Sequence, residues 1–371
     1  MSHSTFVFDV DIAPFQANRV FDPSYARQYP GAEAFAALGA SLRDAGLETV
    51  TADVYLNEPD VGRPAVCLSN ELTRFTDELL SFDSVVPVAC MSLESPICAI
   101  DFYRRIREVS ERFRHVFLWG GMRERAAGGA TFHEISWPYP NVQTLDESPS
   151  WSERRFLVLV NSNKRIFIPP RQLVRLRHPR QSAKSLMVAG GLSKLRRDEP
   201  WLASELYKDR LDAIRHFAGR ADFDLFGRGW SDTSTLSGPE ARAVTRSYRG
   251  ELPIFAKVST LSNYRFALCF ENTAFPGYIT EKIFDCFVAG CIPVYLGAPD
   301  IASLIPAGAF IDAREFSHLT GLESFIRDLR PEVAREYVVA AADFMSSKRA
   351  ELFSQAHFVR AVADVLLQAA R

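Results

Sequence analysis

The sequence lacks the short motifs of several common enzyme classes. It contains no G-x-G-x-x-G, no G-x-x-x-x-G-K-[ST], no G-x-S-x-G and no H-E-x-x-H. Their absence argues against the usual dinucleotide-binding dehydrogenases, P-loop NTPases, nucleophile-elbow hydrolases and zincins. The seven histidines have no ligand-like spacing, so we expect no histidine metal site.

Cysteine is scarce and long hydrophobic runs are missing. The six cysteines mostly lie inside apolar segments without paired spacing, as expected for buried thiols in a reducing compartment. No window approaches 18 consecutive apolar residues, and the N-terminus has no basic segment followed by an apolar one. We therefore expect neither a secretory signal nor a membrane span, and we predict a cytoplasmic protein.

Net charge is also small, because 43 Lys and Arg residues face 45 Asp and Glu residues. This balance argues against nucleic-acid partners. Residues 154–197 depart from it, with twelve Lys or Arg residues and no Asp or Glu. A solvated basic face on a long loop is the simpler interpretation. The alternative is a basic rim near a nucleotide, or one that meets an anionic glycan or lipid-linked acceptor at a membrane surface.

The most informative segment is residues 270–282, FENTAFPGYITEK, followed directly by IFDCFVAGCIPVYLGAP. Apolar runs at 264–270 and 291–296 indicate strands, and apolar residues at helical spacing over 283–288 indicate a helix. The order is strand, loop, helix, strand. In such a unit, the loop after the first strand and the N-terminus of the helix form a ligand-facing edge that favours anions.

Charges at the start of this helix sharpen the prediction. Thr280 can cap the helix and Glu281 suits its dipole. Lys282 places a cation beside a partial positive charge, which is unfavourable unless an anion lies opposite. A diphosphate would supply that anion.

The segment resembles the donor-binding signature of the α1,3/4-fucosyltransferases, glycosyltransferase family 10. That pattern reads FEN, a short spacer, Y-[VI]-T-E-K, a helix and G-x-[IV]-P-[VI], and about ten specified positions over some 27 residues make a specific signal. The resemblance implies an α/β protein of GT-B architecture, with two Rossmann-like domains facing across a cleft. It also implies a bacterial-type inverting enzyme that transfers L-fucose from GDP-β-L-fucose.

Two further segments carry the resemblance. Residues 90–96, CMSLESP, are similar to a family segment whose glutamate is the proposed catalytic base, here Glu94. Taken alone, this segment is typical of a polar turn. The stretch ELYKDRLDAIRHFA resembles the family helix that carries a diphosphate-binding arginine, which corresponds to Arg210. Taken alone, a mid-helix arginine is typical of a solvated surface.

The resemblance implies roles for the remaining site residues. Arg210 and Lys282 neutralise the leaving diphosphate, and Asn272, Tyr278 and Glu281 line the nucleotide and ribose. The other donor candidates are Glu271 for the sugar hydroxyls and Ser162 and Asn163 for the phosphates.

No metal ligand is expected. The D-x-D at Asp222 and Asp224 lies in a strand-like segment, where alternation makes at least one carboxylate structural. We expect no required cofactor, although divalent Mn or Mg stimulates some members of the family.

Alternating patterns predict two successive α/β halves. Residues 1–150 would form the acceptor-side domain, 151–350 the GDP-sugar donor domain, and 351–371 a C-terminal helix packing back on the first domain. In the first half we expect strands at 5–10, 48–52, 65–68, 88–93 and 115–119, and helices at 32–45, 72–80 and 101–112.

The acceptor remains open. An oligosaccharide, lipopolysaccharide or lipid-linked glycan would fit, with α1,3 transfer to GlcNAc or Glc. One alternative keeps the reaction but uses another GDP-deoxyhexose, because the phosphate-binding residues do not read the sugar. A more distant alternative is a non-catalytic glycan- or nucleotide-binding module. Retention of Glu94 argues against it, since such a module needs no base.

Overall fold

The computed structural model describes residues 4–29, 31–139, 149–163, 194, 197–202 and 204–371. Most of the basic segment 154–197 therefore lies outside the described residues. The chain divides into two compact units, which we describe separately. Unit 1 comprises Met1–Glu94, Cys98–Asn141 and Ala350–Arg371, and unit 2 comprises Ser95–Ile97 and Val142–Arg349.

Unit 1 is built on a parallel sheet with the strand order β2-β1-β3-β4-β5-β6. The strands are β1 (Thr5–Asp9), β2 (Glu48–Thr51), β3 (Ala65–Asn70), β4 (Val85–Met91), β5 (His115–Leu118) and β6 (Thr131–Glu134). Every residue of β1 is buried, as expected for a parallel strand covered on both faces. The strand order reverses between β1 and β3, which makes that position the switch point of this sheet.

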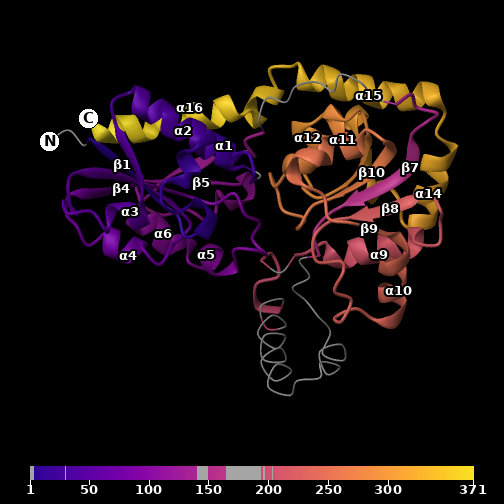
Figure 1. Cartoon of the computed structure of the whole chain (residues 1–371), viewed down its shortest axis with the longest axis horizontal. Helices are drawn as coiled ribbons and strands as arrows, with labels where there is room; N and C mark the ends of the chain where they lie inside the picture. The colour runs from indigo at the N-terminus through magenta and orange to yellow at the C-terminus, as the bar shows by residue number, and fades with distance from the viewer. Residues whose placement is uncertain (1–3, 30, 140–148, 164–193, 195–196, 203) are drawn as a thin grey trace. The chain divides into compact units, whose positions relative to one another are not determined.

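Helices cover both faces of the unit 1 sheet (Figure 1). On one face α2 (Ala32–Asp44) packs against α16 (Gln355–Ala370), which also contacts β3 and β4. The other helices are α1 (Pro23–Ala26), α3 (Ala52–Tyr55), α4 (Thr76–Leu79), α5 (Ile100–Arg104) and α6 (Ile106–Arg112), with 3-10 turns η1 (Ala13–Phe15), η2 (Arg19–Phe21), η3 (Gly120–Met122) and η7 (Ala350–Phe353).

Two helix predictions for this unit need correction. The single helix expected over 101–112 is divided into α5 and α6, because Arg105 leaves the helical region at φ −94° and ψ 13°. The helix expected over 72–80 shrinks to α4. Its first residues instead form a turn in which the Thr73 hydroxyl accepts a hydrogen bond from the Phe75 amide, a local bond that competes with the helix.

Unit 2 contains a second parallel sheet, with the order β12-β11-β10-β7-β8-β9. Its strands are β7 (Arg155–Val160), β8 (Phe223–Phe226), β9 (Tyr248–Gly250), β10 (Tyr264–Phe270), β11 (Ile292–Leu296) and β12 (Ile311–Asp312). The chain adds β8 and β9 on one side of β7, then crosses to add β10, β11 and β12 on the other. The switch point therefore lies between β7 and β10, where open α/β sheets bind ligands at the carboxyl edge.

Helices also flank the unit 2 sheet on both sides, with α9 and α10 on one face and α11, α12 and α15 on the other (Figure 1). The α-helices are α9 (Tyr207–Phe217), α10 (Gly238–Ser247), α11 (Lys257–Leu261), α12 (Glu281–Val288), α13 (Ile301–Leu304), α14 (Leu319–Asp328) and α15 (Pro331–Met345), and the 3-10 turns are η4 (Ile254–Ala256), η5 (Ala307–Ala309) and η6 (Ala313–Glu315). One hydrophobic core joins α9 to the central strands, through residues such as Leu211, Ile214, Phe223 and Leu268.

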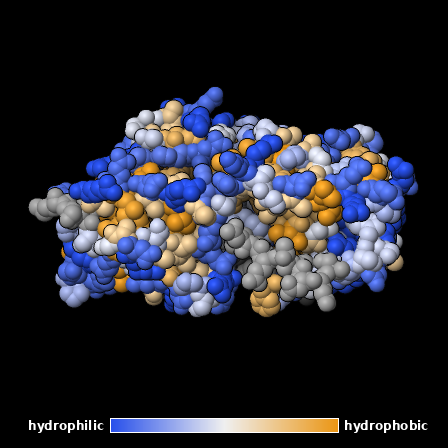
Figure 2. All heavy atoms as spheres, turned by 90° about the horizontal axis from the view of Figure 1, so that it is seen from above, coloured by the Kyte–Doolittle hydropathy of each residue, from blue (hydrophilic) through white to orange (hydrophobic). Residues whose placement is uncertain are grey.

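The surface seen in Figure 2 is largely hydrophilic, with small hydrophobic areas separated by polar residues. The large hydrophobic side chains that are exposed in the described residues are Ile12, Val61, Phe255, Phe325, Val339 and Leu352. Among these residues, no helix is both long enough and apolar enough to cross a membrane.

Candidate functional site

The candidate site lies at the switch point of unit 2, where β7 and β10 end side by side. Asn161 follows β7, and its side-chain amide donates to the carbonyl of Phe270, the last residue of β10, at 3.1 Å. Gly227, directly after β8, closes the same edge. A Cβ atom on Gly227 would lie 2.1 Å from the Asn161 carbonyl oxygen, so only glycine fits. Neither residue was predicted from the sequence, although the N-S-N and G-R-G motifs that follow apolar runs indicate loops at the ends of strands.

Arg210 is the most unusual residue at this edge. It lies on the buried face of α9 and is only 1% exposed, which corrects the reading of a solvated arginine. Its Nη2 atom donates to the Phe270 carbonyl at 2.8 Å and to the Asn272 side-chain oxygen at 2.9 Å. Nε and Nη1 have no hydrogen-bond partner among the described residues. Burial lowers the pKa of the guanidinium, and buried unpaired donors are rare in folded proteins.

Asn272 and Tyr278 join Arg210 in one buried group. The Asn272 side-chain amide donates to the Tyr278 hydroxyl at 3.3 Å, and the Asn272 backbone carbonyl accepts from the amide of Leu206, just before α9. Both side chains are less than a tenth exposed. The structure thus brings together three of the residues assigned by resemblance, from α9 and from the loop after β10.

Lys282 has an anionic partner within the chain. Its ammonium group donates to the Glu271 carboxylate at 2.8 Å and to the Thr280 hydroxyl at 2.8 Å. Glu271 is fully buried, and its oxygens also accept from the amide and hydroxyl of Thr280. The charge conflict noted in the sequence is therefore resolved without a diphosphate. Thr280 precedes the first residue of α12, but its side chain makes no capping hydrogen bond because it faces Glu271.

Glu281 lies in a row of alternating charges. Its carboxylate is 3.4 Å from Lys257 and 3.8 Å from Lys282, and Lys257 also pairs with Asp285 at 2.6 Å. Although burial acts to raise it, the two lysines hold the pKa of Glu281 at about 2. Glu281 is therefore ionised throughout the physiological range. Sequence reasoning missed Lys257, because its partners lie 24 and 28 positions further along the chain.

Ser162 and Asn163 lie at the same edge, in the loop after β7. The Asn163 side chain donates to the Gly229 carbonyl at 3.2 Å, and its backbone amide donates to the Arg228 carbonyl at 2.8 Å. Asn163 thus ties this loop to the loop after β8. Ser162 is partly buried beside it.

Glu94 belongs to unit 1, in the loop after β4. Its backbone is held firmly, since its carbonyl accepts from the Tyr103 hydroxyl at 2.8 Å and the Trp119 indole at 3.0 Å, and its amide donates to the Ser92 hydroxyl at 3.2 Å. Its side chain is exposed. Two buried aromatic donors therefore fix the main chain while the carboxylate faces solvent.

Residues 194–339, which include the segment from Arg210 to Lys282, match glycosyltransferase family 10 (fucosyltransferase), C-terminal part. This segment of the chain is therefore similar to the C-terminal part of glycosyltransferase family 10 proteins.

Relatives found by sequence are named as fucosyltransferases. The chain is 28% identical over 215 residues to human alpha-(1,3)-fucosyltransferase 4, covering 54% of this chain and 37% of the human protein. It is 46% identical over 125 residues to rat GDP-fucose protein O-fucosyltransferase 3, covering 33% of this chain and 24% of the rat protein. The matched part thus spans less than two fifths of either relative. A crystal structure of an α1,3-fucosyltransferase, 14% identical, aligns with 98% of this chain and 90% of its own at a TM-score of 0.50. The fold is GT-B-like, with two parallel six-stranded sheets.

The two aspartates of the D-x-D are both paired with arginines. Asp222 accepts from Arg327 at 2.9 Å. Asp224 is fully buried, and its carboxylate lies 2.5 Å from Arg155 and 2.7 Å from Arg249. These contacts indicate structural carboxylates. Among the described residues no group of three or more His, Cys, Asp or Glu could hold a metal ion.

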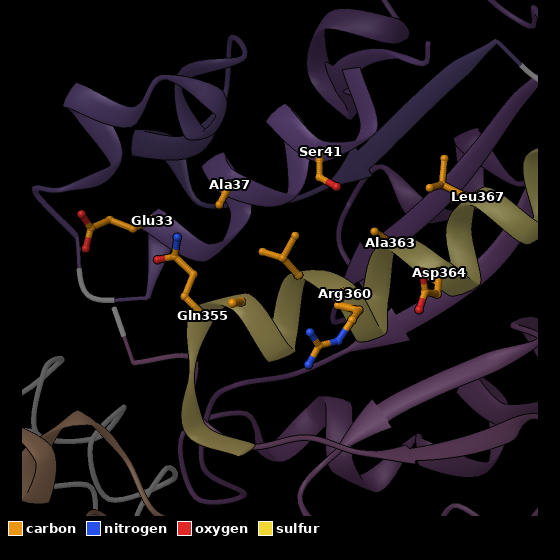
Figure 3. A pocket seen from close by; sticks show the side chains of 10 residues that line it. Glu33, Ala37, Ser41, Gln355, Arg360, Ala363, Asp364 and Leu367 are labelled. Carbon is orange, nitrogen blue, oxygen red and sulfur yellow. The ribbon is translucent and has the colours of Figure 1, made fainter. Parts of the chain in front are cut away.

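Two surface hollows lie away from these residues. One lies in the groove between α2 and α16, which pack against each other in unit 1, and is lined by Ala37, Ser41, Arg360, Ala363 and Asp364 among others (Figure 3). The other lies at the amino ends of β7 and β10, beside Arg155 and Tyr264, which is the opposite sheet edge from Arg210. The donor candidates are therefore identified by their position at the carboxyl edge of the unit 2 sheet and by the buried, unpartnered donors of Arg210 among the described residues. They are not identified by a surface hollow.

Proposed function

We propose that this protein is an inverting glycosyltransferase that transfers L-fucose from GDP-β-L-fucose to a hydroxyl group of an acceptor glycan, with an α1,3 linkage to GlcNAc or Glc. The observation that carries the proposal is the Arg210 guanidinium, buried at the switch point with two nitrogen atoms that have no hydrogen-bond partner in the described part of the chain. Glu271 and Glu205 favour the charge of Arg210 from nearby, but no ion pair joins it to a carboxylate among the described residues. A diphosphate would supply a direct counter-charge and acceptors for the two nitrogen atoms. The names of the family 10 relatives support fucose as the sugar.

Residues of the loop after β10 would complete the donor site. Lys282 would add a second positive charge beside the diphosphate, and Glu271 would hold the Lys282 ammonium in place. Asn272, Tyr278 and Glu281 would line the nucleotide and ribose. As the bond to the sugar breaks, Arg210 and Lys282 would stabilise the charge that develops on the leaving GDP, an electrostatic effect that is often the largest catalytic contribution.

Glu94 would act as the general base, within an acceptor side that we place in residues 1–150, with the donor in 151–350. Its carboxylate takes the proton from the acceptor hydroxyl while that oxygen forms a bond to the anomeric carbon. The bond between this carbon and the GDP oxygen breaks, and GDP leaves with the electron pair. Because attack occurs opposite the leaving group, the β-linked donor gives an α-linked product.

A second acceptor class has its own support. The rat relative, 46% identical over 125 residues, is named a protein O-fucosyltransferase. A serine or threonine hydroxyl on a protein is therefore the alternative to a glycan hydroxyl. The donor alternative, another GDP-deoxyhexose, persists because Arg210 and Lys282 would contact only the diphosphate.

Product analysis tests both questions. Purified protein is incubated with a panel of GDP-sugars and with glycan and peptide acceptors, and products are identified by mass spectrometry and linkage analysis. We expect fucose transfer to a glycan, and GDP should raise the unfolding temperature more than UDP does. Equal stabilisation by GDP and UDP would contradict the donor assignment. Transfer from another GDP-deoxyhexose but not from GDP-fucose would favour the donor alternative.

A further inference from the structure

Glu71 is a strained residue at the carboxyl edge of the unit 1 sheet. It follows β3 directly and has φ of 66°, a left-handed conformation that is unfavourable for a residue with a Cβ atom. Its backbone amide donates to the Met91 carbonyl at the end of β4, at 2.8 Å. Strain of this kind tends to occur at functional sites.

The Glu71 carboxyl group is connected to Glu94 through one hydroxyl. Ser92 Oγ donates to Glu71 Oε1 at 2.8 Å and accepts from the Glu94 amide at 3.2 Å. In the part of the chain that the structure describes, no cation forms an ion pair with Glu71 and its second oxygen accepts no hydrogen bond. Because Glu71 is only half-buried, this second oxygen is available to accept a hydrogen bond from a bound hydroxyl group.

The groups around Glu71 make its ionisation sensitive to pH. Burial raises its pKa to about 7, the Ser92 hydroxyl opposes this rise, and the nearby Glu94 adds to it. The other titratable groups that face it are the buried Tyr103 phenol of α5 and the Cys90 thiol, which donates to the Glu71 carbonyl. Both lose their protons only well above neutral pH, so Glu71 is the group of this cluster that ionises near it.

We propose that Glu71 binds a hydroxyl group of the acceptor, beside the hydroxyl that Glu94 deprotonates. The unpartnered Glu71 oxygen accepts a hydrogen bond from this hydroxyl, and Ser92 holds the two glutamates in register. The inference rests on the proposed function, since it takes Glu94 as the base.

Kinetics of Glu71→Gln test this role, with Glu78→Gln, an exposed glutamate of α4, as the matched control. Loss of the charge should raise the acceptor KM about tenfold while GDP affinity is unchanged. In the unsubstituted protein the acceptor KM should rise as pH falls through about 7, because the carboxylate becomes protonated. The Glu71→Gln variant should lack this rise, and Glu78→Gln should keep it.

Glu71→Gly separates binding from structure. Glycine adopts the left-handed conformation without strain, so the unfolding temperature should stay the same or increase, while the acceptor KM rises by about 10- to 100-fold. An unchanged acceptor KM in both Glu71 variants would overturn the inference and leave the proposed function standing. Lower unfolding temperatures with an unchanged pH profile would also overturn it, in favour of a structural role. Absence of GDP binding by the unsubstituted protein would overturn the proposed function and this inference with it.

Discussion

Replacing Arg210 with methionine should separate ligand binding from folding. Methionine keeps much of the apolar volume of the side chain but removes the charge and all its donors. The variant loses two hydrogen bonds, to Phe270 and Asn272, each worth about 1.5–3 kcal/mol for a charged donor. The substitution also removes two buried nitrogen atoms that have no hydrogen-bond partner among the residues the structure describes, each of which destabilises the fold by about 1–3 kcal/mol.

These opposing effects are of similar size, so the net change in stability should be small. We expect the free energy of unfolding to change by less than about 2 kcal/mol. In a domain of this size, each kcal/mol shifts the unfolding temperature by roughly 2–4 °C. The Phe270 carbonyl still accepts from Asn161 after the substitution. The Asn272 side-chain oxygen loses the Arg210 donor, whereas the side-chain amide nitrogen still donates to Tyr278.

The effect on GDP should be large by comparison. Loss of one charge-assisted contact of about 1.5–3 kcal/mol weakens binding by about 10- to 100-fold. At a GDP concentration 100 times the original Kd, binding stabilises the unsubstituted protein by about 2.7 kcal/mol. The same concentration should stabilise the Arg210→Met variant by only about 0.4–1.4 kcal/mol.

Thermal unfolding and calorimetry measured with and without GDP give both quantities from the same preparation. Arg215→Met is the control, because Arg215 lies on the same helix with a side chain 52% exposed. It should leave GDP stabilisation intact. Unchanged GDP affinity in Arg210→Met would refute the diphosphate assignment. A large loss of stability without GDP would instead show that Arg210 is a structural residue.

Three further outcomes are expected. Glu94→Gln should lower kcat about 10²- to 10⁴-fold with GDP affinity preserved; near-normal turnover in a steady-state assay would return Glu94 to a structural role. Lys282→Ala should weaken GDP binding and also lower the free energy of unfolding by about 3–5 kcal/mol, because the buried Glu271 carboxylate loses its ion-pair partner and keeps only the hydrogen bonds from Thr280; adding Glu271→Gln should restore stability in chemical denaturation but not affinity. Glu323→Gln should destabilise the protein by on the order of 3 kcal/mol at pH 7, because the hydrogen bond from Arg220 outweighs the effect of burial and lowers the pKa of Glu323 to about 2. The difference in free energy of unfolding between the two proteins should be complete above about pH 4.5 and should disappear as pH falls toward 2, as unfolding measured across this range would show.

The sequence predicted the central strands of both units because each is a continuous apolar run. β1, β10 and β11 begin within one residue of their expected positions. β6 was missed because its four residues, TFHE, are exposed or half-exposed, so they carry no buried hydrophobic pattern. The division between α5 and α6 was missed because Arg105 is as good a helix former as its neighbours.

Charge partners were harder to predict than strands. The prediction of an external anion for Lys282 considered only the helix terminus, whereas Glu271 reaches the ammonium from the preceding strand end. The burial of Arg210 could not be predicted from the sequence of α9, because Arg210 lies at the edge of the apolar face of this helix, where a side chain can be buried or exposed. Both outcomes depend on how β10 and α9 pack, which hydrophobic periodicity does not specify.

Position at a switch point does not identify a ligand-binding group by itself. Asp9 ends β1 at the switch point of unit 1 and is fully buried, as Arg210 is in unit 2. The Asp9 carboxylate accepts hydrogen bonds from the hydroxyls of Ser69, Thr73 and Thr76, which satisfy it within the chain. Arg210 retains two unpartnered donors among the described residues. Because a buried polar group left unsatisfied destabilises the fold unless something binds it, the contrast favours Arg210 as a ligand-binding group and Asp9 as a structural one.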